Sequence, residues 1–152
     1  MLIEQKIKEL GYELAEAPKP LAAYVPCVQS GNLVFTAGQL PLVNGELKYS
    51  GQVGKDISEE DGKKAAEISL LNCLSVIKGM TGDLDKIKRI VKLTVFIASP
   101  TDFYKQPAVA NGASELLLKI FGDDGKHARS AVGVPSLPLN AAVEIEMIAE
   151  LK

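Results

Sequence analysis

The sequence lacks any apolar stretch that approaches the ~20 residues needed to span a lipid bilayer. Residues 1–7 carry charged side chains where a signal peptide would have its apolar core. From these two absences we expect a soluble protein of the cytoplasm. Hydrophobic residues make up 47% of the chain and charged residues 24%, as in an average globular protein, and residues 1–152 are expected to form a single domain.

Side chains that commonly bind metals are also scarce. The chain has one histidine, His127, and two cysteines, Cys27 and Cys73, which lie far apart and form no CxxC pair. Because no Cys/His cluster and no spaced trio of carboxylates is evident, we expect no catalytic metal centre and no cofactor. Both cysteines are expected to be reduced and to act as small hydrophobic side chains.

The features of a nucleic-acid-binding surface are missing as well. The formal net charge is −2, the Lys and Arg residues are scattered, and aromatic residues make up only 5% of the chain. A surface that binds single-stranded nucleic acid usually combines a basic groove with aromatic rings on which the bases stack. We therefore expect that nucleic acid is not the main ligand.

Turn residues and hydrophobic periodicity divide the chain into helices and strands. In chain order, the pattern predicts a short helix over 3–10, a loop over 12–21, strands over 23–29, 33–37 and 47–49, a helix from Ser58 to Gly79 or Gly82, a strand over 87–98, a helix from Pro107 to Gly122, and strands over 129–134 and 142–151. After the first helix the order is β-β-β-α-β-α-β-β. This order indicates an α+β fold in which two helices pack on one face of a mixed sheet.

The last predicted strand has two chemically different faces. Successive side chains of a strand point to opposite sides, which groups Val143, Ile145, Met147, Ala149 and Leu151 on one face and Glu144, Glu146, Ile148 and Glu150 on the other. The apolar face is expected to meet the helices. The acidic face must then meet solvent, a ligand or another copy of the chain.

Arg129 is a candidate ligand-binding residue. It stands at the start of the apolar strand 130–134, where a charge is costly unless an anion meets it. If strands 129–134 and 142–151 pair as a hairpin, Glu144 lies beside Arg129 and its carboxyl group is expected to stay ionised. A planar guanidinium is suited to a two-bonded grip on a carboxylate ligand. On these residues alone, a plain surface charge at Arg129 and a solvated Glu144 remain open.

Several short stretches of the sequence resemble the RidA (YjgF-like) family. They are Ala-Arg-Ser-Ala-Val at 128–132, Leu-Pro at 137–138, Val-Glu-Ile-Glu-Met at 143–147, and upstream the stretches at 24–25, 31–33, 38–39 and 91–96 together with Asn111. In the order and spacing of the family, the resemblance covers residues 20–152. The long loop at 41–54 and the stretch at 111–114 are similar to the branch labelled endoribonuclease or chorismate-mutase-like.

The resemblance implies a homotrimer whose ligand clefts lie between subunits. In this family an arginine binds the substrate carboxylate, and a glutamate positions water for the hydrolysis of reactive enamines or imines, such as 2-aminoacrylate, to a keto acid and ammonia. Arg129 and Glu144 match these two positions in the sequence, and Tyr24, Asn111 and Gly38 match other substrate-binding residues of the cleft. The implied activity is a deamination that needs neither metal nor cofactor.

The sequence departs from the family pattern at several positions. Ala37 stands where the family has a cleft serine, and Ala131 where a cysteine is common, so the pocket is expected to be more apolar. Pro135 and His127 also replace the usual residues. Because His127 follows a turn-like stretch at 122–126, we expect it to lie away from the cleft and to contribute little to activity.

Two other functions remain open from the sequence. A non-catalytic protein that binds small carboxylates would need Arg129 but not Glu144. An endoribonuclease, the label that this branch carries, is disfavoured because the chain has no pair of histidines, no basic stripe and few aromatic residues. Among the cleft residues, Tyr24 is also compatible with a half-buried strand position, and Asn111 with the surface of its helix.

Overall fold

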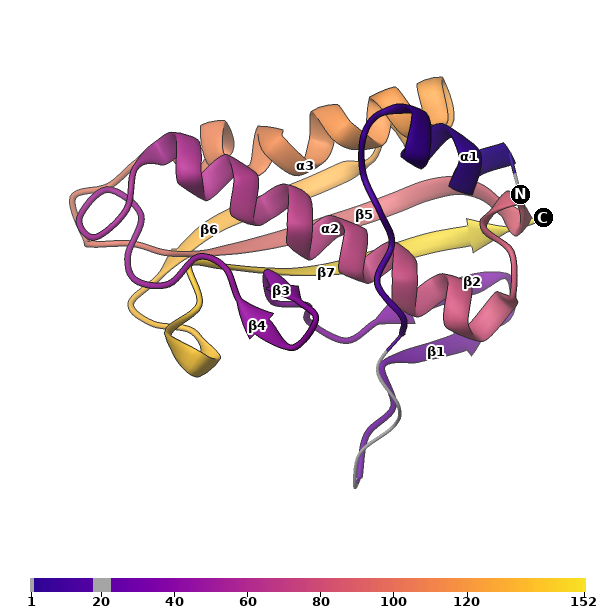
Figure 1. Ribbon diagram of the computed structural model, residues 1–152, viewed down its shortest axis with the longest axis horizontal. Helices are drawn as coiled ribbons and strands as arrows, with labels where there is room; N and C mark the ends of the chain where they lie inside the picture. The colour runs from indigo at the N-terminus through magenta and orange to yellow at the C-terminus, as the bar shows by residue number, and fades with distance from the viewer. Residues whose placement is uncertain (1, 18–22) are drawn as a thin grey trace.

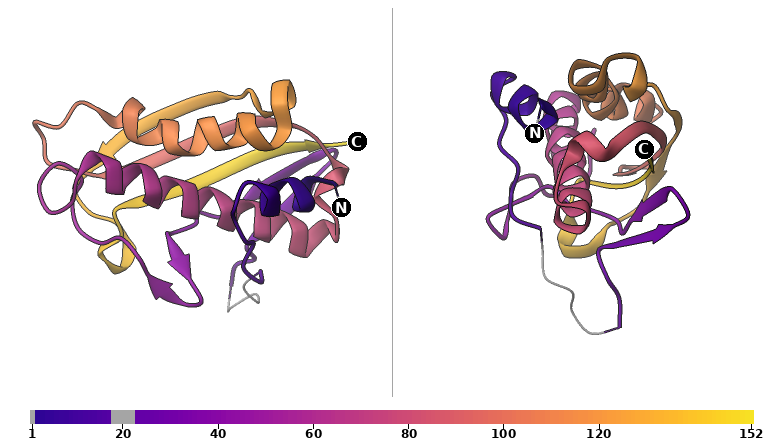
Figure 2. Two further views of the ribbon diagram at one scale, coloured as in Figure 1. Left: turned by 45° about the horizontal axis from the view of Figure 1, so that its top comes forward. Right: turned by 90° about the vertical axis from the view of Figure 1, so that its right-hand side faces the viewer.

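The computed structural model describes residues 2–17 and 23–152. Its elements are α1 (Leu2–Glu9), β1 (Cys27–Ser30), β2 (Leu33–Thr36), β3 (Leu42–Val43), β4 (Glu46–Leu47), α2 (Glu59–Thr81), the 3-10 helix η1 (Leu84–Lys86), β5 (Ile87–Ala98), α3 (Gln106–Phe121), the 3-10 helix η2 (Gly122–Gly125), β6 (Ala128–Val134), the 3-10 helix η3 (Pro138–Asn140) and β7 (Val143–Leu151). Helices α2 and α3 pack against each other on one face of a mixed sheet (Figures 1 and 2), which confirms the predicted α+β fold.

The two long helices form where their capping residues predict. Ser58 is the N-cap of α2, and its hydroxyl accepts a hydrogen bond from the backbone N–H of Asp61 at 3.1 Å. Of the two glycines predicted to end this helix, Gly82 does so with a φ of 81°, and Gly79 lies inside the last turns. Helix α3 begins one residue before Pro107, as a proline in a first turn allows.

The core lies between the sheet and these helices. The central strand β5 matches the predicted strand over 87–98, and its residues Leu93, Val95 and Ile97 are fully buried under the helices. Cys73 of α2 is buried in the same core, and this burial raises the pKa of its thiol to about 12. Both cysteines are free, as expected. No helix among the described residues combines the length and hydrophobicity that crossing a membrane requires.

The N-terminal strands are shorter than the sequence pattern suggests. The first, predicted over 23–29, begins only at Cys27, and the third, predicted over 47–49, is the two-residue β4. Strand β4 pairs with the unpredicted β3 through a tight turn in which Asn44 and Gly45 both have positive φ angles. The predicted loop over 12–21 has no regular structure over 12–17, and its remainder lies outside the described residues.

The order of the strands corrects one prediction that matters for function. In the five-stranded sheet the order is β1-β2-β7-β5-β6, so β6 and β7 do not pair as a hairpin. Helix α3 connects β5 to β6, and a connection of this kind makes the two strands parallel neighbours. Strand β7 pairs with the other edge of β5. The chain passes from β6 to β7 across the end of β5, through η3.

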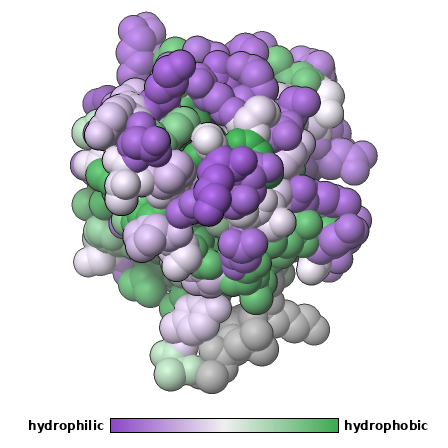
Figure 3. All heavy atoms as spheres, turned by 90° about the vertical axis from the view of Figure 1, so that its left-hand side faces the viewer, coloured by the Kyte–Doolittle hydropathy of each residue, from purple (hydrophilic) through white to green (hydrophobic). Residues whose placement is uncertain are grey.

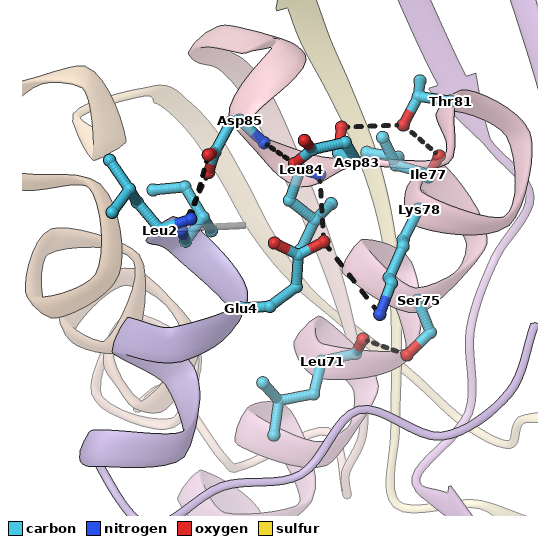
Figure 4. Close-up of polar contacts among 11 residues, drawn as sticks. Leu2, Glu4, Leu71, Ser75, Ile77, Lys78, Thr81, Asp83, Leu84 and Asp85 are labelled. Carbon is cyan, nitrogen blue, oxygen red and sulfur yellow. Dashed lines mark hydrogen bonds and ion pairs between the residues drawn. The ribbon is translucent and has the colours of Figure 1, made fainter.

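Acidic side chains hold α1 against η1 (Figure 4). The carboxylate of Asp85 accepts a hydrogen bond from the backbone N–H of Leu2 at 2.9 Å, and Glu4 accepts one from the N–H of Leu84 at 3.3 Å. Glu4, Asp83 and Asp85 offer carboxylate oxygens within 4.8 Å of one another, a grouping that their sequence spacing did not reveal. Because Asp85 and Glu4 accept these bonds from the backbones of α1 and η1, we interpret the cluster as the anchor of the N-terminal helix.

Candidate functional site

Arg129 points to the helix side of the sheet. It pairs in register with the fully buried Leu93 of β5, and residues paired across neighbouring strands point to the same face. Its Nη1 donates hydrogen bonds to Asn111 Oδ1 at 2.8 Å and to Ser114 Oγ at 3.1 Å, both on α3. Asn111 and Ser114 lie three residues apart, which places both side chains on one face of the helix. The structure therefore brings two of the predicted site residues, Arg129 and Asn111, into contact.

These two contacts leave one edge of the guanidinium for a ligand. A guanidinium has five N–H donors, and the two on Nη1 are used by Asn111 and Ser114. Within residues 2–17 and 23–152, Nε and Nη2 of Arg129 make no hydrogen bond. Along that edge one Nε–H and one Nη2–H lie side by side, the spacing that a carboxylate accepts with both oxygens. Arg129 lines a cavity of about 210 Å³, with room for a small acid.

His127 lines the same cavity as Arg129, which the sequence analysis did not expect. The 3-10 helix over 122–125 turns the chain so that the imidazole reaches α3. Its Nε2 is 2.9 Å from Ser114 Oγ, and its Nδ1 is 2.7 Å from the carbonyl oxygen of Gly125. Burial lowers the pKa of His127, and the positive charge of Arg129 lowers it further, against the opposing effect of the Gly125 carbonyl.

Glu144 lies on the opposite face of the sheet. It pairs with Phe96 of β5, and both side chains point away from the helices and are half-buried. A Cβ atom built on Gly38 would collide with the carboxylate of Glu144, coming within 2.8 Å of its Cδ. Glycine at this position therefore makes room for the carboxylate, and the structure brings these two predicted site residues together. Burial raises the pKa of Glu144, and the negative charge of Glu146 raises it further.

Within one chain, Arg129 and Glu144 are well separated. Strand β5 lies between their strands, and their partners on β5, Leu93 and Phe96, are three residues apart. Two strand spacings of about 4.8 Å and three rises of about 3.3 Å place the two Cα atoms about 14 Å apart, with side chains on opposite faces. Their predicted contact is therefore wrong for a single chain. Arg129 is also not among the charges that act on the pKa of Glu144.

Three further residues concern the candidate site: Tyr24, Ala131 and Ser114. Tyr24 is 65% exposed, and its hydroxyl makes no hydrogen bond among the residues that the structure describes. Ala131 lies two residues after Arg129, so it shares the helix side of the sheet and packs against the core. Ser114 was missed by the sequence analysis, although its position one helical turn after Asn111 placed it on the same face of α3.

A larger cavity of about 390 Å³ lies at the far end of β6, away from both parts of the site. It is lined by Gln52, Ser99, Pro100, Thr101, Phe103, Tyr104, Gln106, Gly133, Val134 and Pro135. None of these side chains carries a charge. Figure 3 faces the end of the molecule where β5 and β6 finish, and hydrophilic and hydrophobic residues are interspersed there. We therefore place the candidate site at Arg129 and Glu144 and not in this uncharged cavity.

Comparison with known proteins covers nearly the whole chain. A family model described as "YjgF/chorismate_mutase-like, putative endoribonuclease" matches residues 4–151. Protein TCP17 of Trypanosoma cruzi is 41% identical over 150 residues, which cover 98% of this chain and 94% of TCP17. A 2-iminobutanoate/2-iminopropanoate deaminase of Dermatophagoides farinae is 32% identical over 136 residues, which cover 90% of this chain and 91% of that protein.

Solved structures with the same fold extend the comparison. The crystal structure of Atu1372 from Agrobacterium tumefaciens, a protein described as having unknown function, is similar with a TM-score of 0.93 and 45% sequence identity, covering 99% of this chain and 93% of that one. The structure of Escherichia coli TdcF with bound serine has a TM-score of 0.65 at 27% identity, covering 93% and 100% of the two chains. These matches confirm the resemblance predicted from the sequence: the chain belongs to the RidA (YjgF-like) family.

Proposed function

We propose that the protein is a metal-free deaminase that hydrolyses reactive 2-enamine or 2-imine acids, such as 2-aminoacrylate, to a keto acid and ammonia. The observation that carries this proposal is the guanidinium of Arg129, which α3 holds by Nη1 alone while the Nε–Nη2 edge remains for a ligand. A half-buried cation with an open two-donor edge is suited to a carboxylate. Two relatives support this ligand class, because one is named an iminobutanoate/iminopropanoate deaminase and TdcF was solved with bound serine.

We further propose that the complete site forms between copies of the chain in a homotrimer. One copy cannot present Arg129 and Glu144 to the same small acid, because they lie on opposite faces of its sheet. The open face of the sheet also has apolar residues for a second copy to cover: Val28, Phe35 and Val132 are 51%, 37% and 42% exposed. In this assembly, the open face of one copy brings its Glu144 to the Arg129 of a neighbour.

The proposed chemistry divides between the two residues. Arg129 binds the carboxylate of the substrate and thereby fixes the position of its imine carbon. An enamine acid such as 2-aminoacrylate first tautomerises to its imine. Glu144 then accepts a proton from a water molecule as the water oxygen bonds to the imine carbon and the C=N π electrons move to nitrogen. Glu144 returns this proton to the nitrogen, and the carbinolamine collapses to the keto acid as its C–N bond breaks, its hydroxyl proton passes to the leaving nitrogen and ammonia is released. Burial raises the pKa of Glu144, which makes it a stronger base than an exposed carboxylate when it is ionised. General-base help of this kind is worth about 10²–10⁴-fold in rate.

The experiment that tests this function is an ammonia-release assay with 2-aminoacrylate generated in situ. We expect turnover by the wild type, loss of both binding and turnover in Arg129→Ala, and a kcat lowered by about 10²-fold with near-normal affinity in Glu144→Gln. Lys64→Ala is the control, because Lys64 is an exposed cation of α2 outside both parts of the site. A wild type that binds pyruvate at Arg129 but releases no ammonia would establish a carboxylate-binding protein in place of an enzyme.

A further inference from the structure

A short chain of hydrogen bonds runs from Arg129 through α3 to His127. Ser114 Oγ lies 3.1 Å from Nη1 of Arg129 and 2.9 Å from Nε2 of His127, and Nδ1 of His127 lies 2.7 Å from the carbonyl oxygen of Gly125. The two ends of this chain have fixed roles. A guanidinium can only donate, so Ser114 accepts from Arg129, and a carbonyl can only accept, so Nδ1 of His127 must carry a hydrogen.

The fixed directions of the Arg129–Ser114 and His127–Gly125 hydrogen bonds determine the protonation state of His127. With its hydrogen on Nδ1, a neutral imidazole presents Nε2 as an acceptor, and the hydroxyl hydrogen of Ser114 donates to it. Every donor then has an acceptor: Arg129 donates to Ser114, Ser114 donates to His127, and His127 donates to the carbonyl of Gly125. A charged imidazolium would instead direct a second N–H toward Ser114 Oγ, and the hydroxyl hydrogen would lose its acceptor. The geometry therefore fits the neutral Nδ1–H form of His127.

The charges around His127 also favour the neutral form. Lys126 and Arg129 line the smaller cavity with it. Arg89, Lys126 and Glu150 line a hollow of about 630 Å³ that His127 also borders. Lys126 is paired with Asp123 at 3.0 Å, and among these groups Arg129 is the one whose charge acts on the imidazole. Burial and the charge of Arg129 both lower the pKa of His127.

We propose that His127 and Ser114 are positioning residues: the neutral imidazole fixes the Ser114 hydroxyl as an acceptor for Nη1 of Arg129, and so holds the Nε–Nη2 edge ready for the substrate carboxylate. Asn111 accepts the second Nη1 hydrogen at 2.8 Å and completes the support. This inference rests on the proposed binding of a carboxylate at Arg129. It assigns a role to a residue, His127, at which the sequence departs from the RidA pattern.

The first test needs no ligand, because His127 is the only histidine of the chain. Nitrogen-15 NMR of the imidazole distinguishes the two neutral tautomers and the charged form. At pH 7 we expect the neutral Nδ1–H tautomer, and we expect Ser114→Ala to shift the Nε2 resonance through loss of its hydrogen-bond donor. An Nε2–H tautomer or a charged ring at pH 7 would overturn the proposal, since neither allows Ser114 to donate to His127.

The second test measures the affinity for pyruvate by calorimetry. We expect Ser114→Ala and His127→Leu each to weaken binding by about 3- to 10-fold, the effect of one hydrogen bond. His127→Gln places an amide oxygen near the position of Nε2, so we expect it to bind almost as well as the wild type. Because His127 acts through Ser114, the double variant should bind no more weakly than Ser114→Ala alone. Fully additive losses would contradict the proposed chain of contacts.

The same measurements separate this inference from the function on which it rests. Failure of the wild type to bind pyruvate, or equal binding by Arg129→Ala, would refute the carboxylate site and the inference together. Wild-type affinity in both Ser114→Ala and His127→Leu, with Arg129→Ala defective, would refute the inference alone.

Discussion

Mixing two inactive variants is the sharpest test of a site shared between subunits. Arg129→Ala removes the carboxylate anchor and leaves Glu144, whereas Glu144→Gln removes the base and leaves Arg129. The two residues lie on opposite faces of the sheet and about 14 Å apart in one chain. Each variant alone therefore has no complete site, but a mixed assembly regains one wherever the intact Arg129 of one copy meets the intact Glu144 of its neighbour.

The recovered activity has a calculable size. In a cyclic trimer each site takes Arg129 from one copy and Glu144 from the next, so equal and random mixing makes about a quarter of the sites complete. The two variants are unfolded together, refolded as a mixture and assayed for ammonia release from 2-aminoacrylate. We expect about 25% of wild-type activity per chain, well above either variant refolded alone. A mixture that stays at the level of the single variants would refute a site built from two copies.

Three further predictions follow from single positions. Arg129→Lys should weaken pyruvate binding at least tenfold in calorimetry, because an ammonium group lacks the two-donor edge; equal affinity would contradict the proposed contact. Gly38→Ala should lower kcat about tenfold or more with an unchanged circular dichroism spectrum, because the added methyl group displaces the carboxylate of Glu144; full turnover would show that this carboxylate is not needed where it lies. Folding lowers the pKa of His127 from its ordinary value of 6.5. As the pH falls through about 6.5, the unfolded chain therefore takes up more protons than the folded chain. The free energy of unfolding, measured with urea, should then decrease between about pH 7.5 and pH 5.5. His127→Gln should reduce this fall, and an unchanged pH dependence would mean that His127 is not buried in its neutral form.

Capping residues and runs of β-branched residues predicted the long helices and the central strand well. Ser58 and Gly82 bound α2 because each supplies a cap that the helix ends require. The β-branched run over 87–98 predicted β5, since such residues pack well on both faces of a buried strand. In contrast, β1 begins later than predicted, and the two-residue strands β3 and β4 are too short to show alternation.

Non-local contacts account for what the sequence could not predict. A short connection between two predicted strands, 129–134 and 142–151, suggested a hairpin, but the parallel pairing of β6 with β5 places β5 between them. His127 follows a turn-like stretch, and only the packing of that turn against α3 brings the imidazole to Ser114. Arg129 and Glu144 were identified from their positions in the predicted strands, and Asn111 from the family resemblance, whereas the division of Arg129 and Glu144 between two faces depends on strand order.

The opposite orientation of Arg129 and Glu144 has a consequence for how the protein behaves on dilution. If the two residues meet only across an interface, the number of complete sites depends on the concentration of assembled chains and not on the concentration of chains. Specific activity should then decline at low protein concentration, and kcat per chain should fall while KM stays constant, because dilution removes sites without altering those that remain. Assays of this protein at nanomolar concentration would then underestimate its activity.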